Sequence, residues 1–243
     1  MWISRAGWSV LNMLQLIFTL AWTAGLIGVA FVVLLVTRQR RLPLRMAARC
    51  WVPGLLWGSG AKLVVRGVDR VDWTRPHVVV ANHQSMMDIC VLFRAIPVPL
   101  QFLLKQELSR LPLVGAYAKA MGMIFVERSS AREATKRMRE AAQLVKAGAT
   151  LCVFPEGTRS HDGEVLPFKS GAFQIALDSG ADVVPVAIEG SGKVLSLGGL
   201  FRVRPGTITV TIGAPLRTVE IADRQLLAAQ ARESVVALKR EAA

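Results

Sequence analysis

An uninterrupted apolar run fills the N-terminal part of the chain. No charged residue occurs from residue 6 to residue 37. Residues 8–36 would form a helix about 43 Å long, whereas the hydrocarbon core of a bilayer is about 30 Å thick. The apolar region of a signal peptide is shorter, roughly 7–15 residues, and no obvious small-residue cleavage site follows this run. The pattern therefore predicts a membrane-anchoring helix over residues 8–36.

The polar pattern changes abruptly after this run. Five arginines and no acidic residue lie within residues 38–49, whereas only Arg5 precedes the run. The positive-inside bias then places everything after residue 37 in the cytoplasm. We expect the membrane to be a bacterial inner membrane. Residues 46–63 contain two tryptophans and a proline, which is typical of an interfacial segment. A monotopic arrangement, with both apolar segments dipping into one leaflet, stays open.

After residue 60 short apolar runs alternate with amphipathic stretches, which is typical of an α/β layered domain. We expect a single domain over 61–243, with a mostly parallel central sheet flanked by helices, preceded by a membrane anchor over 1–60 (apolar helix 8–36 and basic interfacial segment 38–60). The expected strands are 62–68, 77–82, 100–104, 122–127, 149–154, 183–188 and 206–212. The expected helices are 87–96, 106–120, 131–147, 170–179 and 221–240.

A histidine and an aspartate follow the apolar run Val78-Val79-Val80. His83 and Asp88 stand five positions apart. On one helix they would lie about 140° apart and could not easily touch. They can touch if His83 lies in the turn after the strand and Asp88 lies inside the next helix. The carboxylate would then fix the imidazole tautomer and leave the other ring nitrogen free to take a proton. A structural histidine would show the same spacing.

Three further blocks lie at or within apolar runs that we expect to be strands. In Phe154 to Ser160, a glycine, a hydroxyl and an arginine form a turn that suits a phosphate oxygen. An ordinary turn, with Glu156 and Arg159 as a solvated ion pair, is the alternative. The block Gly122 to Arg128 again ends on an arginine, and residues 183–188 contain Pro185, which suggests a strand start or a bulge.

The four blocks in this order resemble the glycerolipid acyltransferase family, whose best-known members are the 1-acylglycerol-3-phosphate acyltransferases. The family patterns are N-H-x-x-x-x-D, G-x-x-F-x-x-R, F-P-E-G-T-R-S and V-P-V, found here at 82–88, 122–128, 154–160 and 184–186. The resemblance covers roughly residues 60–215. It implies transfer of a fatty acyl group from acyl-CoA or acyl-carrier protein to a lysophospholipid hydroxyl at a membrane, without a cofactor or metal.

The resemblance also implies a role for each matching residue. His83 would be the general base and Asp88 its orienter, while Arg128 and Arg159 would hold the acceptor phosphate. The residues expected to shape the phosphate loop are Glu156, Gly157 and Thr158. The expected supporting residues are Asn82, Lys105, Gly122, Phe125 and Pro185. The favoured acceptor is 1-acylglycerol-3-phosphate, acylated at its sn-2 hydroxyl to give phosphatidic acid. Another lysolipid, such as a lyso-aminolipid, is the runner-up.

Other function classes fit the sequence less well. A hydrolase with a covalent intermediate is disfavoured because no Gly-x-Ser-x-Gly elbow occurs, and Ser85 is a weak nucleophile candidate. A non-catalytic protein that binds acyl chains would not need a base beside a phosphate cradle. The three cysteines are widely spaced, which suggests neither a disulfide framework nor a zinc site.

The chain is strongly basic, with a formal net charge of +13. Such a charge suits nucleic acid or an anionic membrane, and the apolar N-terminus favours the membrane over nucleic acid. The same field would attract an acidic acyl donor. The run Glu189 to Val194 resembles the tail of a phosphate-binding Walker loop, but Ala187 and Val194 occupy positions where that motif needs Gly and Ser or Thr.

Overall fold

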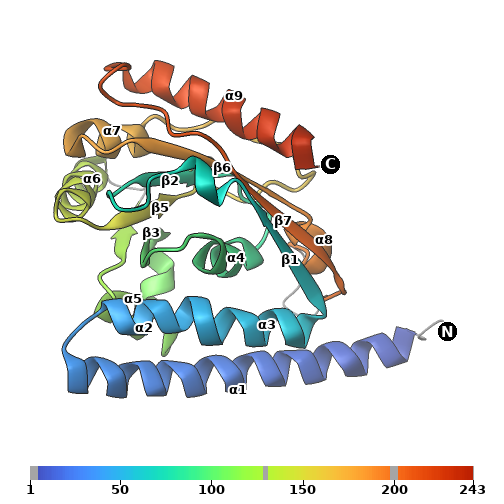
Figure 1. The fold of residues 1–243 in the computed structure, drawn as a ribbon. Helices are drawn as coiled ribbons and strands as arrows, with labels where there is room; N and C mark the ends of the chain where they lie inside the picture. Colours follow the sequence, from blue (N-terminus) through green and yellow to red (C-terminus); the bar gives the residue numbers. More distant parts are fainter. Residues whose placement is uncertain (1–4, 128–130, 198–201, 243) are drawn as a thin grey trace.

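The structure is a computed structural model that describes residues 5–127, 131–197 and 202–242. Its described residues form one sheet in the order β1-β7-β6-β2-β5-β3-β4 (Figure 1). The strands are β1 Ala61–Arg66, β2 Val78–Ala81, β3 Leu100–Lys105, β4 Ile124–Val126, β5 Thr150–Val153, β6 Val183–Glu189 and β7 Gly206–Ile212. Neighbouring strands pair in parallel except β6 and β7, which are antiparallel. The expected mostly parallel sheet is confirmed.

The central strands are apolar because both faces of the sheet are covered. Every residue of β2 and β5 is buried, as expected for parallel strands between two helical layers. Pro185 is the third residue of β6 and lies at an irregularity. Val186 pairs with Ile212, yet Val183 pairs with Leu216, so the partner segment carries one extra residue. A strand start or a bulge was expected at Pro185; Pro185 lies near the start of β6, and the extra residue lies in the segment that follows β7.

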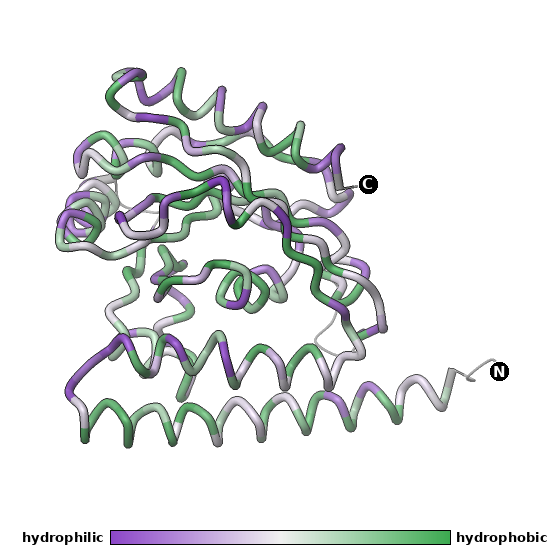
Figure 2. Tube along the Cα trace, viewed as in Figure 1, coloured by the Kyte–Doolittle hydropathy of each residue, from purple (hydrophilic) through white to green (hydrophobic). Residues whose placement is uncertain are grey.

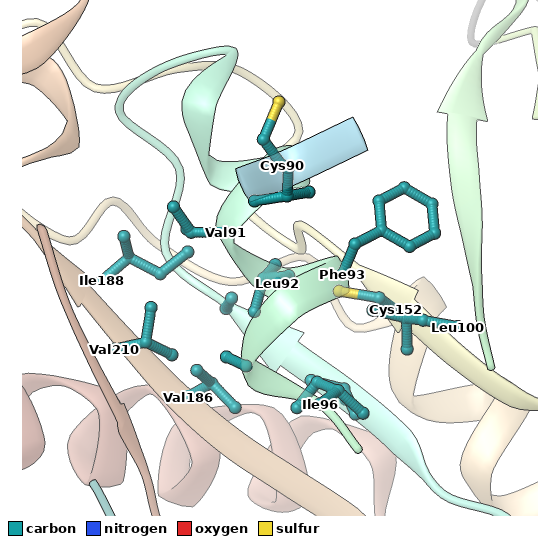
Figure 3. Close-up of a cluster of buried hydrophobic side chains, with 14 of the residues drawn as sticks. Cys90, Val91, Leu92, Phe93, Ile96, Leu100, Cys152, Val186, Ile188 and Val210 are labelled. Carbon is teal, nitrogen blue, oxygen red and sulfur yellow. The ribbon is translucent and has the colours of Figure 1, made fainter. Parts of the chain in front are cut away.

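Helices cover the two faces of the sheet unequally. The helices of the α/β layer are α4 Met87–Ala95, α5 Val114–Ala120, α6 Ala131–Lys146, α7 Gly171–Ser179, α8 Ser191–Val194 and α9 Arg224–Ala242. One face carries α6, α7 and α9; buried side chains of α6, α7 and the first half of α9 form one cluster, and Val235 and Leu238 of α9 belong to a smaller one. The opposite face carries α4, which shares a core with β6, β7 and the N-terminal helices. Figure 3 shows part of this second core, where Leu92 of α4 and Ile96, which follows α4, lie near Val186 and Val210 of the sheet.

Several predicted boundaries are corrected. The helix expected over 106–120 is a 3-10 helix, Gln106–Arg110, followed by α5; Pro112 and Leu113 (φ +59°) separate the two. The last helix begins at Arg224 rather than at 221. Gly148 (φ +97°) follows the end of α6. The Walker-like run forms the short helix α8, after Gly190 (φ +86°).

The N-terminal segment forms two layers of helix. The long helix α1 (Arg5–Thr37) runs side by side with α2 (Arg41–Met46), a π-helical turn (Ala47–Trp51) and α3 (Val52–Ser59) (Figure 1). Most of the segment 38–60, expected to be basic and interfacial, is helical, and Leu44, Ala47, Val52 and Leu55 share the core beneath α4. This second layer therefore joins α1 to the α/β domain.

Specific contacts hold α1 against the second helical layer. The Trp22 indole N–H donates to the carbonyl of Trp51, and the Trp51 indole N–H donates to Thr23 Oγ1 (3.2 and 3.0 Å). Gln15 Nε2 donates to the Gly58 carbonyl at 3.1 Å. A Cβ atom at Gly58 would overlap the Phe18 ring, so glycine permits the close approach of the two helices.

The outer face of α1 is apolar and uncovered. Residues 6–37 are long and apolar enough to cross a membrane, and only 11% of their most apolar window is buried inside the protein. Figure 2 shows the green, hydrophobic positions that follow α1 along its length. The exposed large side chains of α1 include Met13, Leu14, Ile17, Leu20, Val32, Leu35 and Val36. A core helix of a soluble protein would be mostly buried, so this surface suits membrane association.

Candidate active site

His83 and Asp88 meet as the sequence predicted. His83 lies in the turn after β2, and Asp88 is the second residue of α4. The distance from His83 Nδ1 to Asp88 Oδ2 is 2.7 Å. The Asp88 side chain is fully buried, whereas the His83 side chain is 14% exposed. The pair therefore has a buried carboxylate and an imidazole that reaches the surface.

The Asp88 carboxylate is held by backbone N–H groups of the turn between β2 and α4. Its Oδ2 accepts the backbone N–H groups of Gln84 and Ser85 at 2.7 and 2.8 Å, in addition to its contact with the imidazole. These bonds fix the carboxylate, which in turn favours the tautomer that carries its proton on Nδ1 of His83. Within the described residues, Nε2 has no hydrogen-bond partner, so it is the nitrogen left for proton transfer.

The remaining surroundings of His83 come from the block that follows β5. Its ring stacks on Phe154, with centroids 4.0 Å apart and an interplanar angle of 16°. Its backbone N–H donates to Glu156 Oε1 at 2.9 Å, and its carbonyl accepts the N–H of Ser160 at 2.8 Å. The first and third sequence blocks thus form one unit, because β2 and β5 are neighbours in the sheet.

Glu156 has a different surrounding from the one expected. It is only 3% exposed, so it is not half of a solvated ion pair with Arg159. Burial raises the pKa of its carboxyl to about 7, and its Oε2 atom has no hydrogen-bond partner among the described residues. Its bond to the His83 main chain gives it a role in positioning the histidine.

The turn after Glu156 opens towards solvent. Gly157 has φ +75°, a conformation that favours glycine. Thr158 is exposed and Arg159 is partly exposed, and both lie at the carboxyl end of β5, on the same edge of the sheet as His83. This arrangement leaves a hydroxyl and a guanidinium available to an anionic ligand beside the His83–Asp88 pair.

The expected residues of the second block lie further along the sheet. β4, which contains Phe125, is separated from β5 by β3, and Arg128 lies outside the described residues. Gly122 (φ +77°) lies next to the Arg40 guanidinium and the Gln101 amide. Lys105 Nζ pairs with Glu107 Oε1 at 2.8 Å. These residues lie outside the network of hydrogen bonds around His83.

Asn82 ties the site to the next strand. Its side chain accepts the N–H of Ile188 at 2.7 Å and donates to the Ile188 carbonyl at 2.9 Å, so it joins the ends of β2 and β6. Two neighbours that sequence reasoning missed extend this frame. Gln84 Nε2 donates to the Gly163 carbonyl at 3.2 Å, and Phe154 supplies the stacking ring. The phenylalanine that begins the pattern F-P-E-G-T-R-S was the only sequence signal for Phe154, and no sequence signal indicated a role for Gln84.

Ser85, Cys90 and Cys152 are poor candidates for an alternative nucleophile. Ser85 is 1% exposed, and its hydroxyl donates to the Leu195 carbonyl and accepts the N–H of Met87. Burial raises the pKa of the Cys90 thiol to about 12 and also raises that of Cys152. Among the described residues, no cluster of His, Cys, Asp or Glu side chains could hold a metal ion.

Known proteins resemble this chain over most of its length. Residues 62–189 match the family model described as Acyltransferase. A chloroplastic 1-acyl-sn-glycerol-3-phosphate acyltransferase of Brassica napus is 32% identical over 203 residues, which cover 79% of this chain and 58% of that protein. The 1-acyl-sn-glycerol-3-phosphate acyltransferase alpha of Mus musculus is 32% identical over 75% of this chain and 65% of that protein. This chain thus matches less than two thirds of either relative.

A solved structure shows the same architecture. The crystal structure of a 1-acyl-sn-glycerophosphate acyltransferase from Thermotoga maritima superposes with a TM-score of 0.82 and 28% identity, covering 96% of this chain and 95% of that chain. The likeness therefore includes the N-terminal helices as well as the sheet. The family model covers more than half of this chain and contains both His83 and Glu156. The chain belongs to the acyltransferase family.

Proposed function

We propose that the protein transfers a fatty acyl group from a thioester donor to the sn-2 hydroxyl of 1-acylglycerol-3-phosphate, giving phosphatidic acid. The observation that carries this proposal is the His83–Asp88 pair, which keeps Nε2 free beside the turn with Gly157 and Arg159. The curated relatives whose names include this activity support the choice of acceptor.

In the proposed reaction His83 Nε2 takes the proton of the acceptor hydroxyl as its oxygen attacks the thioester carbonyl. The C–O bond forms, the C–S bond breaks, and the imidazolium returns the proton to the departing thiolate. Asp88 stabilises the imidazolium through Nδ1. A positioned imidazole typically contributes 10²–10⁴-fold. A thioester is already activated, so no acyl-enzyme intermediate is needed.

The acceptor phosphate is assigned to the turn after β5. Arg159 offers a forked donor that matches two phosphate oxygens, and Thr158 offers an exposed hydroxyl. By resemblance to the family, Arg128 joins them from the second block. The other residues of the family pattern would frame this site without contacting the reacting atoms, as Asn82 does through Ile188.

The membrane is the proposed source of the acceptor. The uncovered apolar face of α1 and the exposed Trp57 of α3 would embed in the bilayer, with the domain after residue 60 on the cytoplasmic side. The arginines between α1 and the π-helical turn would contact anionic headgroups, each contributing about 1 kcal/mol. Because α1 packs along α3 over several turns, a spanning α1 would have to carry α3 with it, so we favour insertion of both helices into one leaflet.

A panel of acceptors tests the proposal against its runner-up. Purified full-length protein in detergent is assayed with palmitoyl-CoA and either lysophosphatidic acid, lysophosphatidylcholine or a lyso-aminolipid. We expect the highest kcat/KM with lysophosphatidic acid. A higher value with a lyso-aminolipid would move the function to that acceptor, and thioester hydrolysis without transfer would indicate a hydrolase. Absence of any turnover would favour a protein that only binds acyl chains.

A further inference from the structure

The outer face of α6 carries a row of unpaired cations. Arg132, Lys136, Arg139 and Lys146 are all exposed. On an α-helix they fall within about 80° of one another and extend over about 21 Å. None of them forms an ion pair with a carboxylate in the part of the chain that the structure describes. We call this row, together with the exposed Gln143 between its members, the α6 basic stripe.

The acidic side chains of α6 lie beside the stripe. Glu140 is already bound to Arg137, with Nη1 and Oε2 2.7 Å apart. Glu133 lies about 60° further round the helix than Lys136. The surface is hollowed here, with a depression of about 890 Å³ lined by Arg132, Glu133, Thr135, Lys136, Arg139, Glu140 and Gln143. The stripe thus offers positive charge along one side of a shallow concavity.

Topology relates the stripe to the catalytic edge of the sheet. β4 precedes α6 and β5 follows it. β5 pairs in parallel with both β2 and β3, and β3 pairs in parallel with β4, so all four strands point the same way. The helix must therefore run antiparallel to the strands, so its N-terminal turn, with Arg132, lies at the carboxyl edge. His83 and Glu156 lie at that same edge. A partner bound along the stripe would therefore have one end close to the active site.

The stripe faces away from the proposed membrane surface. The buried side of α6, with Ala141, Ala142 and Val145, packs in the cluster formed with α7 and α9. The helical layer of residues 41–59 belongs to the core on the other face of the sheet. Figure 1 shows α6 and α9 across the sheet from α1. A bilayer that holds α1 would not reach the stripe, so its partner must come from solution.

We infer that the α6 basic stripe docks an acidic acyl-carrier protein, which presents the acyl thioester to His83; this inference rests on the proposed function. A row of cations about 21 Å long matches the carboxylates along a helix of such a carrier. The phosphates of CoA are gathered on one nucleotide and would engage one or two of these cations, not the row. The carrier is therefore the donor that uses the stripe.

The test compares two donors with one acceptor. Full-length wild type and the variant Lys136→Glu/Arg139→Glu are assayed with lysophosphatidic acid and either palmitoyl-carrier protein or palmitoyl-CoA. Because steering by complementary charge raises association rates by 10-fold or more, we expect the variant to lose about tenfold in kcat/KM with the carrier donor. The loss with palmitoyl-CoA should stay below about twofold, since the catalytic pair is untouched. Salt should weaken the carrier reaction more in wild type than in the variant.

A matched variant and a binding measurement complete the test. Arg224→Glu/Arg240→Glu changes the net charge equally on exposed positions of α9 and should leave both donors unaffected. Fluorescence anisotropy of a labelled carrier protein reports docking even if no transfer occurs. Weaker binding of the carrier to the α6 variant than to wild type would support the inference. This result would hold even if neither protein showed turnover, which would contradict the proposed function. Equal losses with both donors, equal losses in the α9 variant, or use of palmitoyl-CoA alone would overturn it. Reduced binding to anionic vesicles without reduced carrier binding would also overturn it.

Discussion

At the scale of the residue, His83 is fixed by contacts from two separated segments. Asp88 holds Nδ1, Phe154 stacks on the ring, and Glu156 binds the backbone N–H. These contacts restrict the rotation of the imidazole, so Nε2 keeps one orientation at the carboxyl edge of the sheet. Such preorganisation lets a general base act without reorienting during the reaction.

Glu156 should make the stability of the protein depend on pH. Burial raises the pKa of its carboxyl from 4.5 to about 7, so the folded state binds this proton more tightly than the unfolded chain does. Stability is therefore lost as the pH rises from about 4.5 through about 7. Glu156→Gln stays neutral and keeps an oxygen for the His83 N–H. Between about pH 5 and pH 8, chemical denaturation should show the variant gaining free energy of unfolding relative to wild type.

An exposed carboxylate provides the control for this pH dependence. Glu233 is exposed on α9, so the difference in unfolding free energy between Glu233→Gln and wild type should stay constant over the same range. Parallel curves for wild type and Glu156→Gln would show that the Glu156 carboxyl is ionised in the folded protein and would contradict its assigned burial.

Arg159 should distinguish phosphate-bearing from neutral acceptors. A charge-assisted bond contributes about 1.5–3 kcal/mol, so Arg159→Ala should lower kcat/KM for lysophosphatidic acid by roughly 10–100-fold. Arg159→Lys should recover only part of this, because an ammonium lacks the bidentate fork. The loss should shrink for a neutral monoacylglycerol acceptor. Equal losses on both acceptors in steady-state assays would remove Arg159 from phosphate recognition.

The sequence predicted the contact between His83 and Asp88 because both residues lie within one short turn whose geometry follows from the apolar run before it. It did not predict the bond from Glu156, which stands 73 positions away from His83. The family pattern placed Glu156 near the phosphate loop, but a pattern of letters does not state which way a side chain points. Its burial became visible only once β2 and β5 were found to be neighbours.

At the scale of the element, α1 and α3 form one unit through small residues and indole hydrogen bonds. Gly54 and Gly58 let the aromatic rings of Trp22 and Phe18 lie against the α3 backbone. The rings of Phe18 and Trp57 also meet edge to face, with centroids 5.6 Å apart. This packing explains why an apolar helix with little burial still keeps a defined place against the domain.

A larger side chain at Gly58 should separate these helices. A Cβ there would overlap the Phe18 ring, and overpacking typically costs about 1–3 kcal/mol. Gly58→Leu should therefore lower the Tm in detergent and speed proteolysis between α1 and α2. Gly28→Leu is the matched control, because nothing lies within 4 Å of a Cβ at that position. Equal effects of the two variants would show that the α1–α3 contact does not support the fold.

The elements differ in how far the sequence predicted them. β2 and β5 were predictable because each contains a run of at least three consecutive apolar residues, which is typical of a strand buried on both faces. The antiparallel β7 could not be distinguished from a parallel strand by its own residues, since direction depends on the connection that precedes it. The sequence predicted an interfacial segment over 38–60 without assigning helices to it, and Pro53 lies in the first turn of α3, where its missing N–H costs nothing.

At the scale of the whole molecule, the positive charge is divided between two surfaces. Arginines of residues 38–49 lie beside the apolar helices, and the α6 basic stripe lies on the other side of the sheet. The first set suits an anionic leaflet and the second a soluble donor. The active site at the carboxyl edge would then receive its two substrates from different directions.

Deleting residues 1–37 should release most of the protein from membranes. The remaining attachment would come from the exposed Trp57 and the arginines that follow α1, so it should require anionic lipid and weaken with salt. Vesicle co-sedimentation at low and high ionic strength measures this, with neutral phosphatidylcholine vesicles as the control. Full binding of the truncated protein to neutral vesicles at high salt would show that α1 is not the anchor.

The most direct measurement of the central claim is the turnover of purified His83→Ala with lysophosphatidic acid and palmitoyl-CoA. Asp88 would keep its bonds to the N–H groups of Gln84 and Ser85, so the variant should fold with a Tm close to that of wild type. Its kcat should fall by about 10²-fold or more, because the base that takes the hydroxyl proton is gone. Near-normal turnover by the folded variant would contradict general-base catalysis by His83.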